Sequence, residues 1–284
     1  MADDHPDNSA QLASASYVLP ALDSDYLLRD SMRGARFQLE YAKAEELLRA
    51  WGVRSTVVIF GSARVMPGGS ADPNAASAPL PAGARPRPGA QSARRYDEAR
   101  KLGRIVSERG GALLANHGIR DNVIATGGGP GIMEAANRGA RDAGAPSIGF
   151  NVELPDEQEP NAYSTPELTF QFHYFAMRKM HFAMRAAALV VFPGGFGTVD
   201  EFFEILTLVQ TGKMKRVPIV VIDRQYWSRV VNFPLLLEEG MISPKELDSF
   251  AFADDAEEAW AALVAGGLTV PPDRGVEPRA DVAP

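Results

Sequence analysis

Short apolar runs rich in β-branched residues recur along the chain and alternate with stretches of helical periodicity. The runs lie at 55–60, 122–127, 146–152, 188–192 and 217–222. The spacing of apolar positions predicts helices at 24–51, 93–109, 173–188 and 198–211, another ending near 143, and two more after 222. Continuous apolar strands are typical of a parallel sheet buried on both faces. We therefore predict an α/β fold, a Rossmann-like doubly wound parallel sheet with helices on both faces.

Changes in composition mark the ends of the domain and one insertion. Residues 1–22 are polar and poor in large apolar side chains, which predicts a disordered tail, and we expect a second flexible tail at 269–284. Residues 65–92 are rich in Pro, Gly, Ala and Ser, a composition that favours a mobile segment. Because the strand–helix alternation continues on both sides of this segment, we interpret it as an insertion within one domain spanning 23–268.

Composition also narrows the classes of partner. The 284 residues carry a formal net charge of −7, which argues against the broad basic surface that nucleic acid requires. The chain has no cysteine, so disulfides, cysteine-ligated zinc and a cysteine nucleophile are excluded. No apolar run reaches the ~20 residues of a membrane span, and the polar N-terminus does not resemble an export signal. We expect a cytoplasmic protein with no membrane partner.

Glycine-rich loops follow the predicted strands at 61–64, 126–131 and 193–198. In open parallel sheets, ligands bind beyond the carboxyl ends of the strands, where such loops lead into helices. One glycine turn is commonplace, whereas three on one edge predict a surface where backbone N–H groups converge on an anion.

The loop "TGGGPGI" at 126–132 has two interpretations. As a tight turn, it needs its glycines only for backbone freedom. Its Gly-x-Gly-x-Gly spacing is also a shortened dinucleotide fingerprint, and Glu153 follows the next strand where a ribose-binding acid is expected. Ile132 replaces the last glycine of the full fingerprint, so an NAD(P)-binding protein stays an alternative and no more.

The segment "PGGFGTVDE" at 193–201 also has a purely structural interpretation. Thr198 and Glu201 match a capping box, with Thr198 as N-cap and Glu201 at the third helical position. The box does not explain why three glycines precede it, or why Asp200 adds negative charge beside a loop suited to anions. Catalysis by a carboxylate is one reason for that charge.

The predicted helix "FHYFAMRKMHF" carries a basic pair, Arg178 and Lys179, among apolar side chains. A basic pair is usually solvated, but this setting predicts that at least one cation lies at a pocket or an interface. His173 and His181 lie two helical turns apart, and we expect packing or partner contacts for them rather than a metal site. The chain contains neither the G-x-S-x-G elbow nor the P-loop motif, and Ser62 has no assignable histidine.

Together these motifs resemble the Lonely Guy family, the cytokinin riboside 5′-monophosphate phosphoribohydrolases, and within it the longer bacterial branch. "PGGFGTVDE" is similar to the PGGxGTxxE signature, "MRKM" to the Arg-Lys element, and "FGSAR" and "GGGPGIMEAANRGA" to two nucleotide loops. The resemblance covers about residues 54–240. The older label of that family, possible lysine decarboxylase, has no chemical support here, because nothing singles out Lys179 as a pyridoxal-phosphate lysine.

The resemblance implies hydrolysis of the N-glycosidic bond of a purine nucleoside 5′-monophosphate, AMP or an N6-modified AMP, with no cofactor and no metal. Arg178 and Glu201 correspond to the catalytic pair. Substrate contacts are implied for Ser62, Gly128, Gly129, Glu157, Lys179, Gly194, Gly195, Phe196, Gly197, Thr198 and Thr207. It also implies a homodimer or a larger homo-oligomer, for which the apolar helix at 173–188 is our candidate interface.

The chemistry suits these residue types. Cleavage of the bond builds positive charge on the ribose, which a carboxylate such as Glu201 can stabilise while it activates water. Arg178 keeps its charge and serves electrostatic or hydrogen-bonding roles. A nucleotide or cofactor carrier on the same fold is the second hypothesis, and it would not need both residues.

Overall fold

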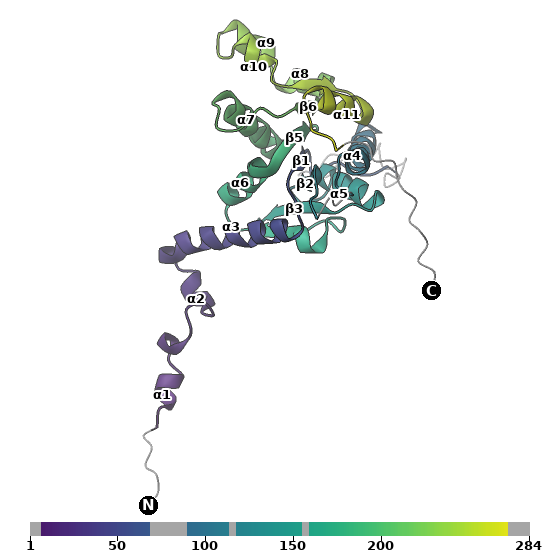
Figure 1. Cartoon of the computed structure of the whole chain (residues 1–284). Helices are drawn as coiled ribbons and strands as arrows, with labels where there is room; N and C mark the ends of the chain where they lie inside the picture. Colours follow the sequence, from purple (N-terminus) through teal and green to yellow (C-terminus); the bar gives the residue numbers. More distant parts are fainter. Residues whose placement is uncertain (1–6, 69–89, 114–117, 155–158, 272–284) are drawn as a thin grey trace, which may run out of the picture.

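A computed structural model describes residues 7–68, 90–113, 118–154 and 159–271. Its centre is one sheet of seven strands in the order β4-β3-β2-β1-β5-β6-β7, and every neighbouring pair is parallel (Figure 1). The strands are β1 Thr56–Phe60, β2 Val123–Thr126, β3 Ser147–Val152, β4 Thr169–Phe172, β5 Ala186–Val191, β6 Ile219–Ile222 and β7 Ala251–Ala253. The predicted doubly wound parallel sheet is confirmed.

The strand order places a switch point between β1 and β5. The chain adds β2, β3 and β4 on one side of β1, then crosses to the other side to add β5, β6 and β7. The loops that leave β1 and β5 therefore diverge to opposite faces of the sheet. A crevice opens at the carboxyl ends of two such neighbouring strands, and it is the usual ligand site of this architecture.

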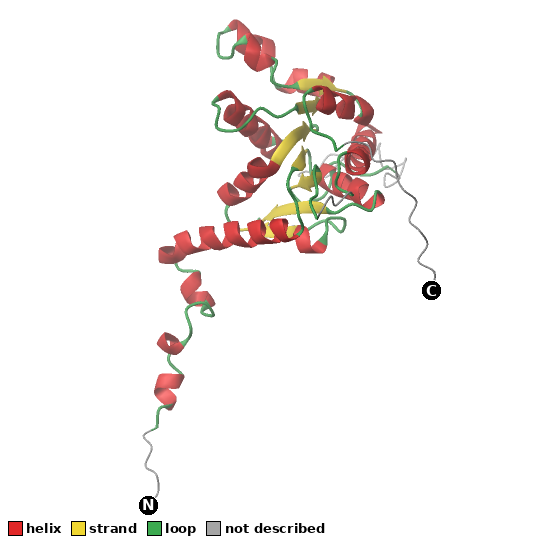
Figure 2. Ribbon diagram, in the orientation of Figure 1, coloured by secondary structure: helices red, strands yellow, loops and turns green. Residues whose placement is uncertain are grey.

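Helices cover both faces of the sheet, and each layer encloses its own apolar core (Figure 2). On one face pack α4 Ala90–Arg109, α5 Ile132–Asp142 and α11 Ala256–Ala265. On the other face pack α3 Arg33–Ala50, α6 Phe175–Arg185, α7 Phe196–Gln210 and α8 Arg224–Val230, followed by α9 Phe233–Glu238 and α10 Pro244–Leu247. All five residues of β1 are buried, as a strand with a helix layer on each side requires.

Four elements differ from the sequence-based expectation. The helix expected at 173–188 is shorter, because α6 ends at Arg185 and β5 begins at Ala186. The helix expected at 24–51 is interrupted: α2 Ser24–Leu27 and a 3₁₀ turn at Asp30–Met32 precede α3. Strands β4 and β7 were not predicted; they are the two edge strands, with four and three residues, too short for a clear pattern.

The N-terminal segment runs away from the sheet in Figure 1. Its described part contains α1 Ser9–Leu12 and a 3₁₀ turn at Ala15–Tyr17, and neither contains a buried residue. Residues 69–89 of the predicted insertion and 272–284 of the predicted C-terminal tail lie outside the described residues. The tails, the insertion and the domain limits stay predictions. In the described ranges, no helix is both long and apolar enough to cross a membrane.

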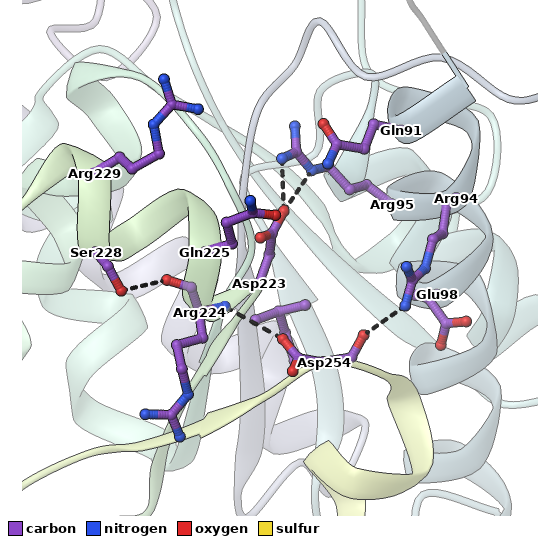
Figure 3. Close-up of a pocket in the computed structure, with 11 residues that line it drawn as sticks. Gln91, Arg94, Arg95, Glu98, Asp223, Arg224, Gln225, Ser228, Arg229 and Asp254 are labelled. Carbon is purple, nitrogen blue, oxygen red and sulfur yellow. Dashed lines mark hydrogen bonds and ion pairs between the residues drawn. The ribbon is translucent and has the colours of Figure 1, made fainter.

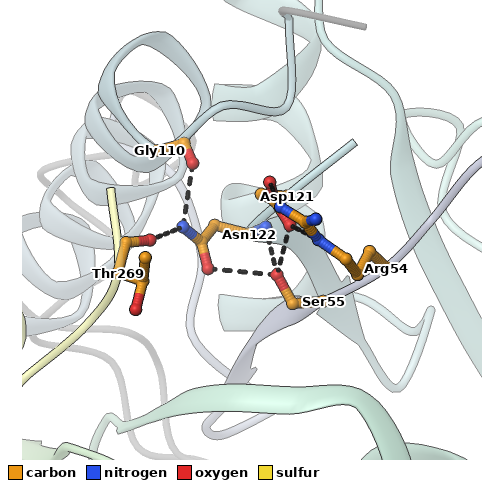
Figure 4. Close-up of polar contacts among 6 residues, drawn as sticks. All are labelled: Arg54, Ser55, Gly110, Asp121, Asn122 and Thr269. Carbon is orange, nitrogen blue, oxygen red and sulfur yellow. Dashed lines mark hydrogen bonds and ion pairs between the residues drawn. The ribbon is translucent and has the colours of Figure 1, made fainter. Parts of the chain in front are cut away.

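A polar cluster fixes the opposite, amino-terminal edge of the sheet (Figure 4). Asn122, which precedes β2 with φ of 53°, donates from Nδ2 to the carbonyls of Gly110 and Thr269, both at 2.8 Å. Ser55 donates to Asp121 at 3.2 Å, and Arg54 pairs with the same carboxylate. Because Asn122 tolerates left-handed backbone and satisfies two carbonyls, it joins the end of α4 to β2 and to the C-terminal segment.

Candidate functional site

The three glycine loops lie on one edge of the sheet, as predicted, and they meet beside the switch point between β1 and β5. The N–H of Ser62 donates to the carbonyl of Pro193 at 3.0 Å, and the N–H of Ile132 donates to the carbonyl of Ser62 at 3.1 Å. The first loop is thus bonded to both of the others. A cleft of about 640 Å³ opens there, large enough for a small ligand. It is lined by Phe60–Arg64, Gly127, Met133, Val152, Leu154, Phe175, Arg178, Gly194–Val199, Glu201, Tyr226 and Val230.

Glycine is required at two points where these loops approach each other. Gly131 has φ of 73° and acts as N-cap of α5, and a Cβ there would overlap the carbonyl oxygen of Ser62. A Cβ on Gly194 would overlap the hydroxyl of Thr198 in the first turn of α7. Gly195, in contrast, has no neighbouring atom within 4 Å of such a Cβ. Close packing thus explains Gly131 and Gly194, whereas Gly195 leaves open space beside the cleft.

Two asparagine side chains, Asn137 and Asn161, hold the glycine loop at 126–131 through hydrogen bonds. Nδ2 of Asn161 donates to the carbonyls of Gly128 and Gly129 at 3.0 and 3.1 Å. Asn137 of α5 accepts from the Thr126 hydroxyl at 2.7 Å and donates to Ser147 at 3.0 Å. These bonds hold the glycine backbone without using its cleft-facing side, and sequence reasoning had identified neither asparagine.

Arg178 of α6 and Glu201 of α7 form a buried ion pair at the cleft. Nη2 of Arg178 lies 3.4 Å from Oε1 of Glu201, and the two side chains are 15% and 4% exposed. The guanidinium of Arg178 also lies over two aromatic rings, at 5.1 Å from Phe175 and 5.7 Å from Phe182. Its buried Nε has no hydrogen-bond partner in the described chain. The arginine therefore keeps donor capacity beyond its one long bond to the carboxylate.

Burial dominates the titration of this pair. It raises the pKa of Glu201 to about 7, although the charges of Lys179 and Arg178 act in the opposite direction. Burial also lowers the pKa of Arg178. A carboxyl group with a pKa near neutrality is populated in both protonation states at physiological pH, which suits a group that exchanges protons with a ligand or water.

The expected capping box is wrong. Helix α7 begins at Phe196, two residues earlier than expected, with Gly195 as its N-cap and without a side-chain capping bond. Thr198 therefore lies inside the first turn, where its side chain packs on Gly194, and Glu201 is turned inward to Arg178. Neither side chain is committed to the helix terminus, so the structural interpretation of the motif no longer accounts for Glu201.

The N-terminus of α7 presents free backbone donors to the cleft. In the described chain, the N–H groups of Gly195, Phe196 and Gly197 have no protein acceptor. These are orphan donors of a first helical turn, and the helix dipole adds partial positive charge beside them. Phe196, at the same rim, is 96% exposed. The arrangement can bind an anion, such as a phosphate, next to a flat apolar surface.

Other predicted ligand residues lie outside this cleft. Lys179 lines a separate groove between α6 and α7, where it forms ion pairs with Asp200 at 2.7 Å and Glu204 at 2.8 Å. Burial lowers the pKa of Lys179, but its hydrogen bonds to these two carboxylates outweigh that effect and raise it. The hydroxyl of Thr207 donates to the carbonyl of Phe203 within α7. Gly128 and Gly129 are buried behind the loop surface, and Glu157 lies outside the described residues.

The histidines and Glu153 also lie apart from the site. His173 precedes α6 and pairs with Glu153 at 2.8 Å beside the edge strand β4, at a separate cleft between α3 and that strand. His181 is buried among the rings of Tyr41, Phe150 and Phe172, and burial lowers its pKa. Because Glu153 lines a different cleft from Gly127, the two do not form the ribose and pyrophosphate contacts of a dinucleotide site.

Tyr226 is a cleft residue that sequence reasoning missed. It lies in α8, 32 residues beyond Gly194, and its hydroxyl donates to the carbonyl of Gly194 at 2.7 Å. The motif "VIDRQYW" gave one usable signal, an Asp followed by a helix at the carboxyl end of a strand, which places the side chain on the correct edge of the sheet.

Known proteins similar to this chain agree with the motifs. A family model described as "Possible lysine decarboxylase" matches residues 133–263. Probable cytokinin riboside 5′-monophosphate phosphoribohydrolase LOG4 of Oryza sativa subsp. japonica is 29% identical over 145 residues, which are 50% of this chain and 62% of that protein. The cytokinin riboside 5′-monophosphate phosphoribohydrolase of Rhodococcoides fascians is 26% identical over 159 residues, 56% of this chain and 79% of the bacterial protein. The predicted resemblance to this family is confirmed, whereas its longer bacterial branch stays a prediction. The chain spans less than two thirds of the rice protein.

Among solved structures, the molybdenum cofactor binding protein from Rippkaea orientalis is similar over 75% of this chain and 97% of its own. The sequence identity is 17% and the TM-score is 0.43. A molybdenum cofactor carrier protein from Chlamydomonas reinhardtii is 19% identical over 75% of this chain and 96% of its own, with a TM-score of 0.41.

Proposed function

We propose, from its relationship to the cytokinin riboside 5′-monophosphate phosphoribohydrolases, that this chain hydrolyses the N-glycosidic bond of a purine nucleoside 5′-monophosphate. The products would be the free base and ribose 5-phosphate. One observation carries the proposal: a buried carboxylate–guanidinium pair, Glu201 and Arg178, lies beside free backbone donors in one cleft. A site that only binds nucleotides has no need to bury a carboxylate next to its anion-binding loop.

We place the 5′-phosphate at the N-terminus of α7. Within the described part of the chain, the N–H groups of Gly195, Phe196 and Gly197 have no acceptor, and Gly195 leaves space for close approach. The dipole of the 15-residue helix favours the negative charge. Ser62, which links the first and third loops, lies beside the same donors, and the ring of Phe196 supplies an apolar surface for the base or ribose.

Glu201 then faces the bond that breaks. As the base departs, positive charge develops on the ribose, and an ionised carboxylate at a buried position stabilises that charge more strongly than water does. With a pKa of about 7, the same group can accept a proton from the attacking water. Burial of Glu201 supports both roles. It raises the proton affinity of the carboxylate, and it keeps water away so that the carboxylate acts more strongly on the charge of the ribose.

Arg178 supplies positive charge and hydrogen-bond donors but no base catalysis, because its guanidinium stays protonated. The guanidinium lies 5.1 Å from the centroid of the Phe175 ring and 5.7 Å from that of Phe182, and these contacts restrict its position. Because Arg178 lines the cleft, we assign one of its terminal N–H groups to the departing base or to the phosphate. For Lys179 we propose an indirect role, since its charge lowers the pKa of Glu201 while it pairs with Asp200 and Glu204.

We also propose a cytoplasmic homo-oligomer, at least a dimer. The groove between α6 and α7, lined by Met180, Ala183, Met184, Leu208 and Met214, is the apolar surface that a second copy would cover. The sequence-based candidate interface was the helix at 173–188 alone, and the groove adds residues of α7 to it. Light scattering tests the assembly, and a monomer at micromolar concentration would overturn it.

The decisive experiment is incubation of the purified chain with AMP, ADP, NAD and N6-isopentenyl-AMP, followed by chromatography of released base and ribose 5-phosphate. We expect release from a monophosphate and none from NAD. The Glu201→Gln protein is the matched control, because it keeps the shape of the side chain and removes its charge. Binding of AMP without release by the wild type would instead favour a carrier, the second hypothesis.

A further inference from the structure

Tyr226 joins the candidate cleft to a second cleft on the far side of α8. Its hydroxyl donates to the Gly194 carbonyl at 2.7 Å, and its ring lines the candidate site. The second cleft, of about 610 Å³, lies between α4 and α8 and is lined by Arg94, Arg95, Asp223 and Arg224 among others (Figure 3). Tyr226 thus stands between a glycine loop on one side and a charged surface on the other.

Two residues of the second cleft hold Tyr226 in place. Oδ1 of Asp223, the N-cap of α8, accepts from the N–H of Tyr226 at 3.0 Å, with Asp223 itself at φ of 71°. Oδ2 of Asp223 accepts from Nη2 of Arg95 at 2.6 Å and from its Nε at 3.2 Å. The guanidinium of Arg95 also lies 5.2 Å from the centroid of the Tyr226 ring. Figure 3 shows the Arg95 and Asp223 side chains pointing toward each other.

The peptide bond explains why one hydroxyl matters. The carbonyl of Gly194 and the N–H of Gly195 belong to one planar trans peptide, so they point in opposite directions. Fixing the carbonyl on the Tyr226 side therefore fixes the Gly195 N–H on the other. Glycines flank this peptide on both sides, so no Cβ restricts its rotation, and a hydrogen bond is needed to select one orientation.

We propose that Tyr226 is a positioning residue for the phosphate-binding loop, and that Arg95 and Asp223 support it from the second cleft. Tyr226 orients the Gly194–Gly195 peptide so that the Gly195 N–H is available to an anion before the ligand arrives. This inference rests on the proposed nucleotide site. It predicts that the loss of the hydroxyl weakens contacts to the phosphate and leaves contacts to the base and ribose intact.

The test compares ligands with and without phosphate. Binding of AMP and of adenosine is measured by calorimetry in Glu201→Gln protein, where turnover does not interfere. Adding Tyr226→Phe should weaken AMP binding by about 3- to 10-fold, the range expected for one hydrogen bond, with adenosine affinity unchanged. Equal loss for both ligands would show a merely structural role, and unchanged AMP affinity would overturn the proposal.

Neighbouring arginines provide the matched controls. Arg95→Gln removes the support of Asp223 and the contact with the Tyr226 ring, and it should reproduce part of the loss for AMP. Arg94→Gln removes a charge from the same cleft. Among the described residues Arg94 hydrogen-bonds only to the carbonyl of Asp254, at 3.5 Å, so this substitution should have no effect. If the two variants weaken AMP binding equally, general electrostatics explains the loss and the proposed support does not.

A ligand-free measurement separates this inference from the proposed function. The amides of Thr198 and Val199 both donate to the carbonyl of Gly195 at 3.0 Å, so they report on the orientation of this loop. Their hydrogen exchange should be at least about 3-fold faster in Tyr226→Phe than in wild type and unchanged in Arg94→Gln. Equal exchange in all three proteins overturns the positioning role even if AMP is hydrolysed. If exchange is faster but the protein binds no nucleotide, the positioning role of Tyr226 is supported and the proposed nucleotide substrate is rejected.

Discussion

Among the described residues, the carboxylate of Glu201 accepts one long hydrogen bond, 3.4 Å, from Nη2 of Arg178, and both side chains are largely buried. A buried pair in a purely structural role is stabilising only when further hydrogen bonds satisfy its remaining lone pairs and protons. Here the donor Nε of Arg178 stays unpaired in the described chain. The pair therefore leaves one buried donor unsatisfied, which a purely structural ion pair does not explain.

Replacing Glu201 should remove turnover without removing binding. We expect Glu201→Gln to lower kcat by about 10²- to 10⁴-fold, the range for loss of a positioned acid–base group, with nucleotide affinity within a few-fold of wild type. Steady-state assays of base release and calorimetry measure the two quantities. Asp200→Asn is the matched control, since this neighbouring carboxylate is 58% exposed. A similar loss in both variants would assign the effect to net charge.

Removing the arginine should shift the pH profile as well as the rate. The charge of Arg178 lowers the pKa of Glu201, so Arg178→Met should raise that pKa above about 7. The ionised carboxylate is the working form, so the acidic limb of the kcat/KM profile, where activity rises with pH, should move to higher pH. Lys179→Met should shift the limb in the same direction, because Lys179 also lowers this pKa. An unchanged limb in both variants would show that Glu201 does not set the profile.

Stability should fall as pH rises through the range between the unfolded and folded pKa values of Glu201. The folded pKa is raised from 4.5 to about 7, so the folded state binds the proton more tightly than the unfolded state. The stabilising effect is present below pH 4.5 and is lost between pH 4.5 and 7, with a slope of at most about 1.4 kcal/mol per pH unit. Urea unfolding of wild type and Glu201→Gln across this range should show the slope in wild type alone.

Alanine at two adjacent glycines should change the free energy of unfolding by different amounts. In Gly194→Ala, the new Cβ overlaps the hydroxyl of Thr198, so we expect about 1–3 kcal/mol of destabilisation, the usual effect of overpacking. In Gly195→Ala, no atom lies within 4 Å, so stability should change by less than about 0.5 kcal/mol. Denaturant unfolding measures both. Equal destabilisation would contradict the packing of the loop on α7.

The location of the site was predictable because it depends on topology. Apolar runs identify the central strands, and parallel strands place the loops after 60, 126 and 192 on one edge of the sheet whatever the details of each loop. Edge strands β4 and β7 were missed because they are short and only partly buried. Their sequences therefore lack the continuous apolar run that identifies a central strand.

The roles of individual side chains were less predictable. A capping box and the first turn observed here contain the same residues, and a shift of the helix start to Phe196 decides between them. The earlier start brings the Thr198 side chain against Gly194, a contact between residues four apart that the capping pattern does not encode. Likewise, the contact of Tyr226 with Gly194 depends on how β6 positions α8, which no local pattern encodes.

The direct passage from α6 into β5 has a mechanical consequence. Arg185 is the last helical residue and Ala186 the first of the strand, so no loop absorbs a change in length between Arg178 and the centre of the sheet. One residue added within α6 after Arg178 would rotate the guanidinium by about 100° around the helix axis, away from Glu201. Elsewhere at the rim, loops can absorb an inserted residue. Here the number of residues between Arg178 and β5 sets the direction in which the Arg178 side chain points.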